Sequence, residues 1–545
     1  MVLRNSLLWL LLFALVCTGA ASATVPADEP EWELIAPGIE FRKFQLPDPN
    51  NVFVARMDRN NPKVILDSTI SQGKISDGRE TVSSMYDRYN QALNFWGGSS
   101  NPPTWGMRNQ VIVAINGSYF DLANGIPQGG QVQSGWYVKR YDKLGGWGGF
   151  TWKLDRSAFI SECLYHVPEK QFITFPATGN IQQINNINQP GGAHELDMYT
   201  PQYDSHTGTN NSGVEVLVEM TYPTMIFPKP AYISGIVRQI RIGEGDSLIP
   251  FNSIVLSAGG ATAKTLLENI SVGSEIRISQ EITSYEYDCS TPYPLSWTKT
   301  YASIQGAFFF LKNGQIREFN DPGAINRRPR TAIAFNDQYI FFLVVDGRDY
   351  YHSVGMTINE LALFVRDTLG ATWGVAQDGG GSSTMVINGQ VANNTYCNNY
   401  TCSGYYTPYL PPDTRNFQNG QSGLQTESIV VNSPSGIERA VANGMLMVLV
   451  QPAVYSTAFK PGDQVTTTSD IEMRLGPGTN YDSFTLVPKG TQMIIMEQMN
   501  GLDGVLAKSS YWWYVDFGGV LGWVPEGALV NLTAKVDIPS WSIRR

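Results

Sequence analysis

The residues best suited to chemistry lie in one short segment, from Gly374 to Met385. An apolar strand leads there into one carboxylate, Asp378, which is followed by glycines and then hydroxyl residues: Gly379, Gly380, Gly381, Ser382 and Ser383. Consecutive glycines let backbone N–H groups converge on an anion without interference from a Cβ atom, and serine hydroxyls add donors. The pattern predicts a catalytic carboxylate beside an anion-binding loop. The alternative is a structural turn that opens on an Asx residue.

Two arginines are the best candidates for holding a phosphate group. Arg330 begins one apolar run, and Arg348 follows the predicted strand at 341–345. A guanidinium fork matches phosphate oxygens, so we expect both side chains to bind phosphate. Asp346 lies just before Arg348, where it can orient that arginine or serve as a second acid or base. Either arginine could instead form a structural ion pair.

A third polar group follows the predicted buried strand at 111–115. Asn116 and Gly117 come directly after this strand, and Asp121 lies four residues further on. Functional groups often occupy loops that a rigid scaffold positions. We expect these residues to line the facing wall of the site, with Asp121 as a further acid or base candidate, although the same residue types also make ordinary turns.

Strands and helices that could position these motifs interleave without a strict βαβ period. This favours an α+β catalytic domain with mixed β-sheets. Helices are expected at 82–92, capped by Thr81, at 261–268, and after a capping box formed by Thr357 and Glu360, which gives Glu360 a structural role. Strands are expected at 214–218, 233–242 and 253–256, and a hairpin with an Asn-Gly turn at 385–391.

The ordered series of motifs resembles the phosphodiester glycosidase family across residues 30–450. The stretches that carry the resemblance are 114–121, 327–335, 341–348, 353–362, 374–385 and 438–443. The resemblance implies hydrolysis of a sugar joined through its anomeric carbon to a phosphodiester. A departing phosphate is a weak base that hardly needs protonation, so one carboxylate can suffice. Asp378 would activate water or attack the anomeric carbon, while cations and N–H groups hold the phosphate charge.

The roles of several residues near the motifs have two interpretations. Arg439 and Asn443 either contact substrate or pack the returning strand, and His352 is expected in an exposed loop. The sequence departs from the family pattern at Gln377 and at 307–309, two places in the expected pocket. These departures concern the identity of the substrate more than the fold.

The N-terminus has the features of a secretory signal at residues 1–23. Arg4 precedes an apolar run at 7–16, and small residues at 21–23 predict cleavage before Thr24. No other stretch is apolar enough to predict a membrane span, so none is expected after cleavage. Four cysteines then remain, Cys163, Cys289, Cys397 and Cys402, and the last two are the expected close pair.

Composition narrows the class of protein. The 545 residues exceed the size at which a single core stops growing, so at least two domains are expected. A net charge of −10 argues against a nucleic-acid partner, which would require a basic face. No cofactor is expected and the metal is unknown: acidic loops leave Ca²⁺ or another divalent ion open, without identifiable ligands.

After a linker at 451–462, residues 463–533 resemble a small all-β bacterial SH3-like domain. The turn at 474–478 and the Gly-Trp-Val stretch at 522–524 carry this resemblance. Such a barrel could bind a cell-wall polymer or have an inert packing role. Its tryptophans, Trp512, Trp513 and Trp523, would form either a flat binding surface or the barrel core.

Together these patterns predict a secreted or envelope-associated hydrolase. The expected substrate is a sugar-1-phosphodiester linkage in an envelope or extracellular glycopolymer. Two alternatives remain: a glycosidase for a non-phosphorylated polysaccharide, and a catalytically silent wall-binding protein.

Overall fold

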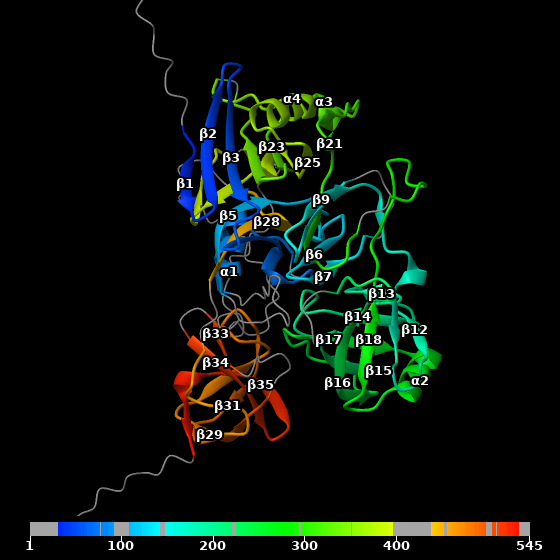
Figure 1. Ribbon diagram of the computed structural model, residues 1–545. Coiled ribbons are helices and arrows are strands. Elements are labelled where there is room, and N and C mark those ends of the chain that lie inside the picture. The colour runs from blue at the N-terminus through cyan, green and yellow to red at the C-terminus, as the bar shows by residue number, and fades with distance from the viewer. Residues whose placement is uncertain are drawn as a thin grey trace, which may run out of the picture.

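The computed structural model describes most of the chain as β-structure with short helices (Figure 1). The described residues are 31–76, 78–91, 108–141, 148–220, 225–293, 296–349, 351–395, 438–451, 455–497, 504–507 and 510–532. Strand pairs within these ranges are antiparallel, apart from the parallel pair β13–β14. The expected α+β class is therefore corrected toward a mostly β fold that includes a mixed sheet.

The first sheet carries the strand that leads into Asp378. Its spatial order is β1 (Glu33–Ala36), β2 (Ile39–Leu46), β3 (Asn50–Asp58), β24 (Tyr339–Val345), β23 (Arg330–Phe335), β25 (Trp373–Ala376), β21 (Phe309–Lys312) and β22 (Gln315–Ile316). Both faces are buried at the central strands β23 and β24. Along β24, Phe342 and Val344 join the large central core, while Phe341 and Leu343 join a smaller core beneath the helices. Burial on both faces explains why this strand is continuously apolar.

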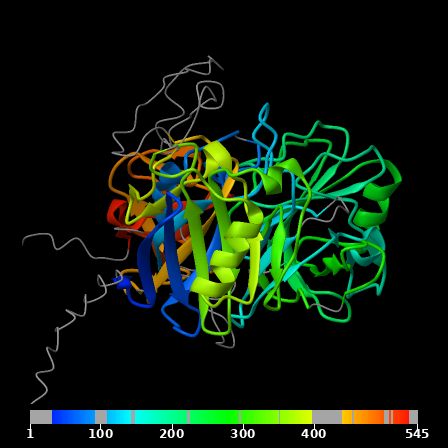
Figure 2. The same cartoon turned by 90° about the horizontal axis from the view of Figure 1, so that it is seen from above.

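Two helices cover the outer face of the first sheet, as Figures 1 and 2 show. These are α3 (Pro322–Ile325) and α4 (Ile358–Leu363), and α4 continues as a π-helix at Phe364–Thr368. The expected capping box is confirmed: Glu360 N donates to Thr357 Oγ1 at 3.1 Å, and Thr357 N donates to Glu360 Oε2 at 2.8 Å. Glu360 also pairs with Arg327, so its carboxylate has the structural role that the sequence predicts.

Two five-stranded sheets form the centre of the molecule. The second sheet has the order β27 (Gln390–Val391), β26 (Met385–Ile387), β5 (Arg108–Asn116), β28 (Asn443–Gln451) and β4 (Val64–Ile70), with α1 (Val82–Gln91) packed against it. The third has the order β7 (Trp136–Lys139), β6 (Gln131–Gln133), β20 (Thr300–Gln305), β8 (Gly149–Lys153) and β9 (Ala158–Ser161). Thr81 caps α1 by accepting from Ser84 N at 3.2 Å, and the Asn-Gly hairpin forms between β26 and β27.

A fourth sheet forms a lobe beside the main body (Figures 1 and 2). Its order is β12 (Ile181–Gln183), β11 (Phe172–Thr174), β18 (Glu275–Ser279), β16 (Ile233–Ile242), β15 (Val214–Met220), β17 (Ser253–Ala258), β14 (Leu196–Tyr199) and β13 (Asn186–Ile187). The predicted helix at 261–268 is present as α2 (Gly260–Asn269), and β10 (Leu164–Tyr165) pairs with β19 (Thr283–Ser284). A disulfide joins Cys163 to Cys289, whereas the expected pair Cys397 and Cys402 lies outside the described residues.

The C-terminal sheet is an all-β unit that packs on the body. It contains β31 (Ser483–Val487), β30 (Ile471–Arg474), β35 (Val520–Pro525), β34 (Ser510–Phe517), β32 (Gln492–Ile495), β29 (Gln464–Thr467) and β36 (Leu529–Asn531), and β33 (Gly504–Ala507) pairs with β34. Trp512, Trp513 and Trp523 are buried, so they form core rather than a flat exposed surface. The Trp523 ring lies 5.6 Å from that of Phe251, which precedes β17 in the lobe.

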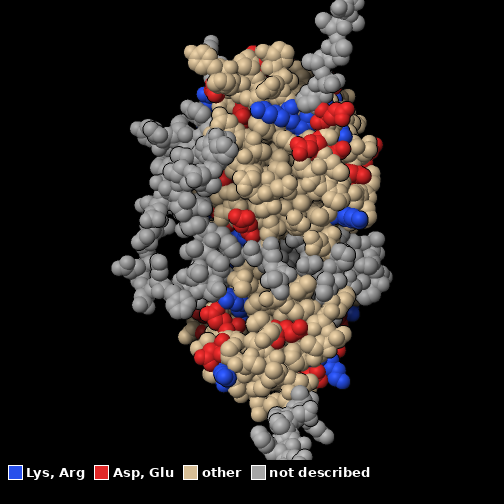
Figure 3. All heavy atoms as spheres, turned by 90° about the vertical axis from the view of Figure 1, so that its left-hand side faces the viewer, with Lys and Arg blue, Asp and Glu red and all other residues tan. Residues whose placement is uncertain are grey.

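Acidic and basic side chains are interspersed on the face shown in Figure 3 rather than gathered into one basic stripe. None of the helices in the described ranges combines the length and apolarity that crossing a membrane requires. In the same ranges, no three His, Cys, Asp or Glu side chains are grouped so that they could hold a metal ion.

Candidate active site

Asp378 lies where the chain crosses from the first sheet to the second. β25 ends at Ala376, a short 3₁₀ turn occupies Gly380–Ser382, and β26 begins at Met385. Asp378 N donates to the carbonyl of Gly117 at 2.9 Å, so the end of β5 holds the start of this loop. The carboxylate is therefore fixed at a junction of two sheets, as a rigid catalytic group requires.

The environment of Asp378 favours a carboxyl group that titrates near neutrality. Asp378 is 8% exposed, and burial raises the pKa of its carboxyl group to about 6. Ser382 Oγ donates to Oδ2 at 2.6 Å, and the nearby Arg439 and the Gly379 N–H oppose the effect of burial. Such a group is ionised at neutral pH and can still accept a proton, which suits a general base or nucleophile.

Asn116 ties three segments together beneath this loop. Its Nδ2 donates to the carbonyl of Asp378 at 2.7 Å, and its Oδ1 accepts from Thr331 Oγ1 at 2.7 Å and from Thr384 N at 3.1 Å. The residue is fully buried. Its carboxamide is thus occupied by the protein, so Asn116 positions the loop instead of facing substrate.

Gly117 is required for close packing at the same place. A Cβ atom on Gly117 would come within 2.4 Å of Asn443 Oδ1. Asn443 in turn accepts from Ser118 N at 2.9 Å and donates to Gln131 Oε1 at 2.9 Å. Of the two interpretations of Asn443, the contacts favour packing.

The glycine loop differs from the expected cradle of N–H groups. Gly380 N donates to the carbonyl of Pro329 at 2.9 Å, and the N–H groups of Ser382 and Ser383 donate within the loop itself. The glycines instead permit close approach. A Cβ atom on Gly379 would lie 2.7 Å from Pro329 O, and Gly380 has a φ of 63°, a conformation that favours glycine.

The two predicted phosphate-binding arginines have different surroundings. Arg330 is 4% exposed, and its guanidinium donates to the carbonyls of Met356 and Asn326, each at 2.7 Å. Burial lowers its pKa to about 10. Arg348 is exposed, and its Nη2 lies 3.0 Å from the place where a Cβ atom on Gly380 would stand. Arg348 therefore borders the Asp378 loop, whereas Arg330 holds the surrounding backbone.

The other two predicted carboxylates are engaged in local structure. Asp346 Oδ1 accepts from Asn393 Nδ2 and from Asn394 N, each at 3.1 Å, and burial raises its pKa to about 6. Asn393 Nδ2 also donates to the carbonyl of Ser383 at 3.1 Å, so Asp346 supports the Asp378 loop from behind. Asp121 lies on an exposed turn, where its carboxylate accepts from Ala123 N at 2.8 Å and from Asn124 Nδ2 at 3.2 Å.

Two further residues reach the Asp378 site. Arg439 Nη1 donates to Ser382 Oγ at 3.1 Å, which places this guanidinium beside Asp378. Burial raises the pKa of the Tyr119 phenol to about 12, and the charge of Asp378 adds to this rise. Both residues belong to motifs visible in the sequence, but nothing in their spacing shows that residues 119, 378 and 439 converge. His352, by contrast, is exposed and pairs with Asp349.

The site also contains polar groups that the described protein leaves unsatisfied. The side-chain oxygens of Ser383 and Thr384 and both amide atoms of Gln377 are buried without a hydrogen-bond partner among the described residues. Buried polar groups are normally paired, so these atoms have unused hydrogen-bonding capacity next to Asp378.

Residues 243–404 match the family model described as phosphodiester glycosidase. This match identifies a glycosidase-type hydrolase, and the matched segment contains Arg330, Arg348 and Asp378. A comparison of the sequence with curated proteins found no match.

Three solved structures resemble the chain at low identity. A hypothetical protein from Synechocystis has 15% identity over 78% of this chain and a TM-score of 0.44, and the chain spans 64% of its length. A protein of Burkholderia pseudomallei K96243, named as an expected exported protein, has 17% identity over 74% of each chain and a TM-score of 0.43. The catalytic domain of zebrafish N-acetylglucosamine-1-phosphodiester alpha-N-acetylglucosaminidase, auto-inhibited by its pro-peptide, has 12% identity over 76% of this chain and 84% of its own, with a TM-score of 0.33.

Proposed function

We propose that the protein is an exported hydrolase of sugar-1-phosphodiester linkages in an envelope or extracellular glycopolymer. The observation that carries the proposal is the buried Asp378, which Ser382 holds and which the guanidinium groups of Arg348 and Arg439 border. Asp378 lies in the segment that matches the phosphodiester glycosidase family. A carboxylate next to cations supplies the two elements that cleavage of a glycosyl phosphate needs. The disulfide supports export, because disulfides persist in oxidising compartments.

In the proposed reaction, ionised Asp378 acts on water at the anomeric carbon. The carboxylate takes one proton from water as the new C–O bond forms and the bond from the anomeric carbon to the phosphate oxygen breaks. The electron pair leaves with the phosphate, whose growing charge is held by Arg348 and Arg439. Direct attack by the carboxylate, followed by hydrolysis of the glycosyl-enzyme, would use the same residues and differ in stereochemistry.

Tyr119 contributes a phenol that remains protonated throughout the neutral range, because its pKa is raised to about 12. It can therefore act as a hydrogen-bond donor toward a sugar or phosphate oxygen but not as a base. Arg330 and Asp346 act indirectly, by holding the backbone on which Arg348 and the glycine loop lie.

The experiment that tests the proposal is a product assay on matched substrates. One set carries a sugar joined to a phosphodiester at the anomeric carbon, and the other carries the same sugar as a plain aryl glycoside. We expect release of free sugar and phosphomonoester from the first set at a kcat/KM at least tenfold above the second. Faster cleavage of the plain glycosides would replace the proposal with a glycosidase for non-phosphorylated glycans, and no turnover of either set would favour a binding protein.

A further inference from the structure

A cavity of about 120 Å³ lies where three parts of the chain meet, apart from the Asp378 site. The segment after β4 contributes Gln72 and Lys74, the lobe contributes Asp204 and Phe251, and the loop between β30 and β31 contributes Asn480. This last loop follows the 474–478 turn that the sequence marks as characteristic of the C-terminal unit. The residues after this turn therefore lie against the body of the protein.

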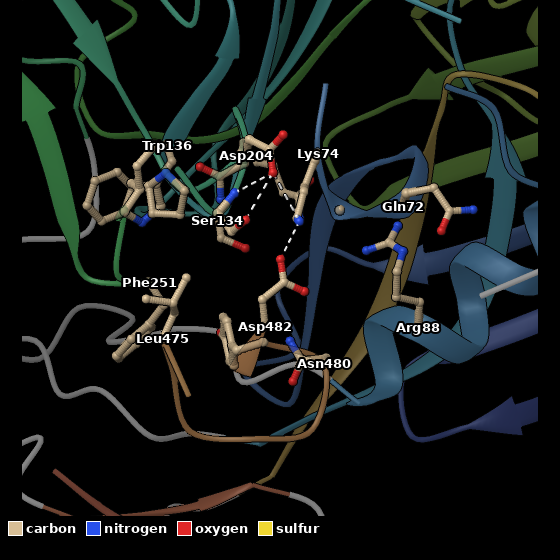
Figure 4. Close-up of a pocket in the computed structure, with 17 residues that line it drawn as sticks. Gln72, Lys74, Arg88, Ser134, Trp136, Asp204, Phe251, Leu475, Asn480 and Asp482 are labelled. Atoms are coloured by element: carbon tan, nitrogen blue, oxygen red, sulfur yellow. Dashed lines mark hydrogen bonds and ion pairs between the residues drawn. The ribbon is translucent and has the colours of Figure 1, made fainter. Parts of the chain in front are cut away.

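One wall of the cavity is aromatic and apolar. Trp136, Phe251 and Leu475 lie together on the left in Figure 4, and each is at most 6% exposed. The Phe251 ring is 5.6 Å from that of Tyr481, and Phe251 N donates to the carbonyl of Leu475 at 3.2 Å. These contacts fix the wall across the boundary between the lobe and the C-terminal unit. Flat rings held in this way can pack against the C–H face of a ligand at little entropic cost.

The cations that line the cavity are already neutralised by carboxylates. Lys74 Nζ lies 3.1 Å from Asp204 Oδ1 and 2.5 Å from Asp482 Oδ2, as the dashed lines in Figure 4 mark. Arg88 Nε lies 3.0 Å from Glu80 Oε2. The lining thus offers no excess positive charge that would select an anion. The side chains of Asp204 and Asp482 remain 25% and 21% exposed, so the cavity is open to solvent.

The remaining polar groups of the lining are mostly amides. Asn480 Oδ1 is buried and has no hydrogen-bond partner in the described ranges. Gln72 and Gln202 add two further carboxamides to the lining. A buried acceptor without a partner is costly, so a rotation of the Asn480 side chain that brings this oxygen to a ligand hydroxyl would be favoured. Ligand sites commonly combine an apolar wall with a few convergent polar groups, and they occur often between domains.

We propose that this junction cavity is a saccharide-binding site that takes a neutral sugar unit of a glycan. An aromatic wall, carboxamides and compensated charge match a ring that has C–H faces, several hydroxyls and no net charge. The choice of a sugar over another neutral ligand rests on the proposed function, since a hydrolase of glycan linkages benefits from holding the polymer beyond the cleaved bond. The C-terminal unit then completes a glycan-binding site with the body instead of acting as a separate anchor.

The test is isothermal titration calorimetry of the full chain carrying Asp378→Asn, which should slow turnover strongly. The probes are three neutral trisaccharides, maltotriose, cellotriose and triacetylchitotriose, with trialanine and inorganic phosphate as comparators. We expect saturable binding of at least one trisaccharide. Asn480→Ala in the same background should weaken it about fivefold or more, the scale of one lost hydrogen bond, while the neighbouring exposed Thr479→Ala leaves it unchanged.

Three outcomes would overturn the inference: no binding of any trisaccharide, equal binding by the Asn480→Ala protein, or tighter binding of trialanine or phosphate. Asn480→Ala with Asp378 intact separates this inference from the proposed function, because turnover of a small sugar phosphodiester should remain within twofold. Trisaccharide binding with no phosphodiester turnover would sustain the cavity assignment and reject the catalytic one.

Discussion

Asn116 and Asp378 are 262 residues apart in the chain, and Asn116 Nδ2 donates to the main-chain carbonyl of Asp378 at 2.7 Å. This bond fixes the backbone that carries the proposed catalytic carboxylate. The same carboxamide accepts from Thr331 and Thr384, so one buried side chain aligns strands of two sheets. Buried groups that are fully satisfied in this way make a site rigid, and losing one leaves several partners unpaired.

Replacing Asn116 should therefore disturb both stability and catalysis. We expect Asn116→Ala to lower the free energy of unfolding by about 1–3 kcal/mol, because it leaves buried donors and an acceptor unpaired. Among folded molecules kcat should fall more than KM rises, since the loop is displaced without loss of a substrate contact. Urea unfolding and steady-state kinetics measure both. A stable variant with normal kcat would show that the bond has no positioning role.

Asp378→Asn should keep the fold and reduce turnover by roughly 10²-fold or more, the scale of a lost acid–base group. The amide is isosteric and can still accept from Ser382. The matched control is Asp121→Asn, which alters a carboxylate on an exposed turn and should leave kcat within about twofold. Near-normal activity in a folded Asp378→Asn protein would remove this residue from the mechanism.

The pH dependence of kcat/KM should follow the ionisation of Asp378. Its pKa is raised to about 6, and the ionised form is the active base or nucleophile. Activity should fall as the pH drops below about 6, approaching tenfold per pH unit, and should level off above it. The pKa of Asp346 is also raised to about 6, so the pH profile of Asp346→Asn should be compared with that of the wild-type protein. An acidic limb that stays near pH 4 in the wild-type protein would contradict the assignment.

Arg348→Lys should affect phosphodiesters more than uncharged glycosides. Lysine keeps the positive charge but loses the planar fork that matches two phosphate oxygens. We expect kcat/KM for the phosphodiester to fall at least tenfold, with a smaller change for the matched plain glycoside. The comparison variant is Arg366→Lys, at a half-buried arginine that pairs with its neighbour Asp367. Equal losses on both substrates would assign Arg348 a structural role.

Asp67 predicts an unusual dependence of stability on pH. It is fully buried, and burial raises its pKa to about 7, despite donors from Ser134 and Tyr89. An unfolded chain loses this proton near pH 4, whereas the folded protein keeps it until about pH 7. Since the folded state then binds more protons, stability should decrease as the pH rises from about 4 to 7.

Asp67→Asn removes that proton linkage. Thermal unfolding of both proteins at pH 5 and pH 8 measures the effect, and the decrease in Tm between the two should be smaller in the variant. The pKa values of Asp346 and Asp378 are also raised, so part of the decrease in Tm should remain in the variant. If Tm decreases equally in the wild-type protein and in the variant, Asp67 is already ionised in the folded protein at both pH values.

Local sequence patterns determined the elements and the main candidate residue. The capping box at Thr357, the Asn-Gly hairpin after β26 and the strand that becomes β24 depend on neighbours a few residues away, so spacing predicts them. Asp378 stood out as the leading candidate because three glycines after a carboxylate allow a close backbone approach that residues with a Cβ atom do not. The mostly β character was underestimated, because several short strands depend on distant partners: β8 pairs with β20, and β10 pairs with β19, each more than 100 residues away.

Only the tertiary structure decided how the candidate residues are used. Arg330 and Arg348 look equivalent in sequence, but the carbonyls of Asn326 and Met356 engage the first, while the second borders the glycine loop. Arg439 reaches Ser382 beside Asp378 across 57 residues of chain, and Trp523 of the C-terminal unit packs against Phe251 of the lobe. Such assignments depend on which strands pair and which surfaces pack together, and these long-range contacts leave no periodic signal in the sequence.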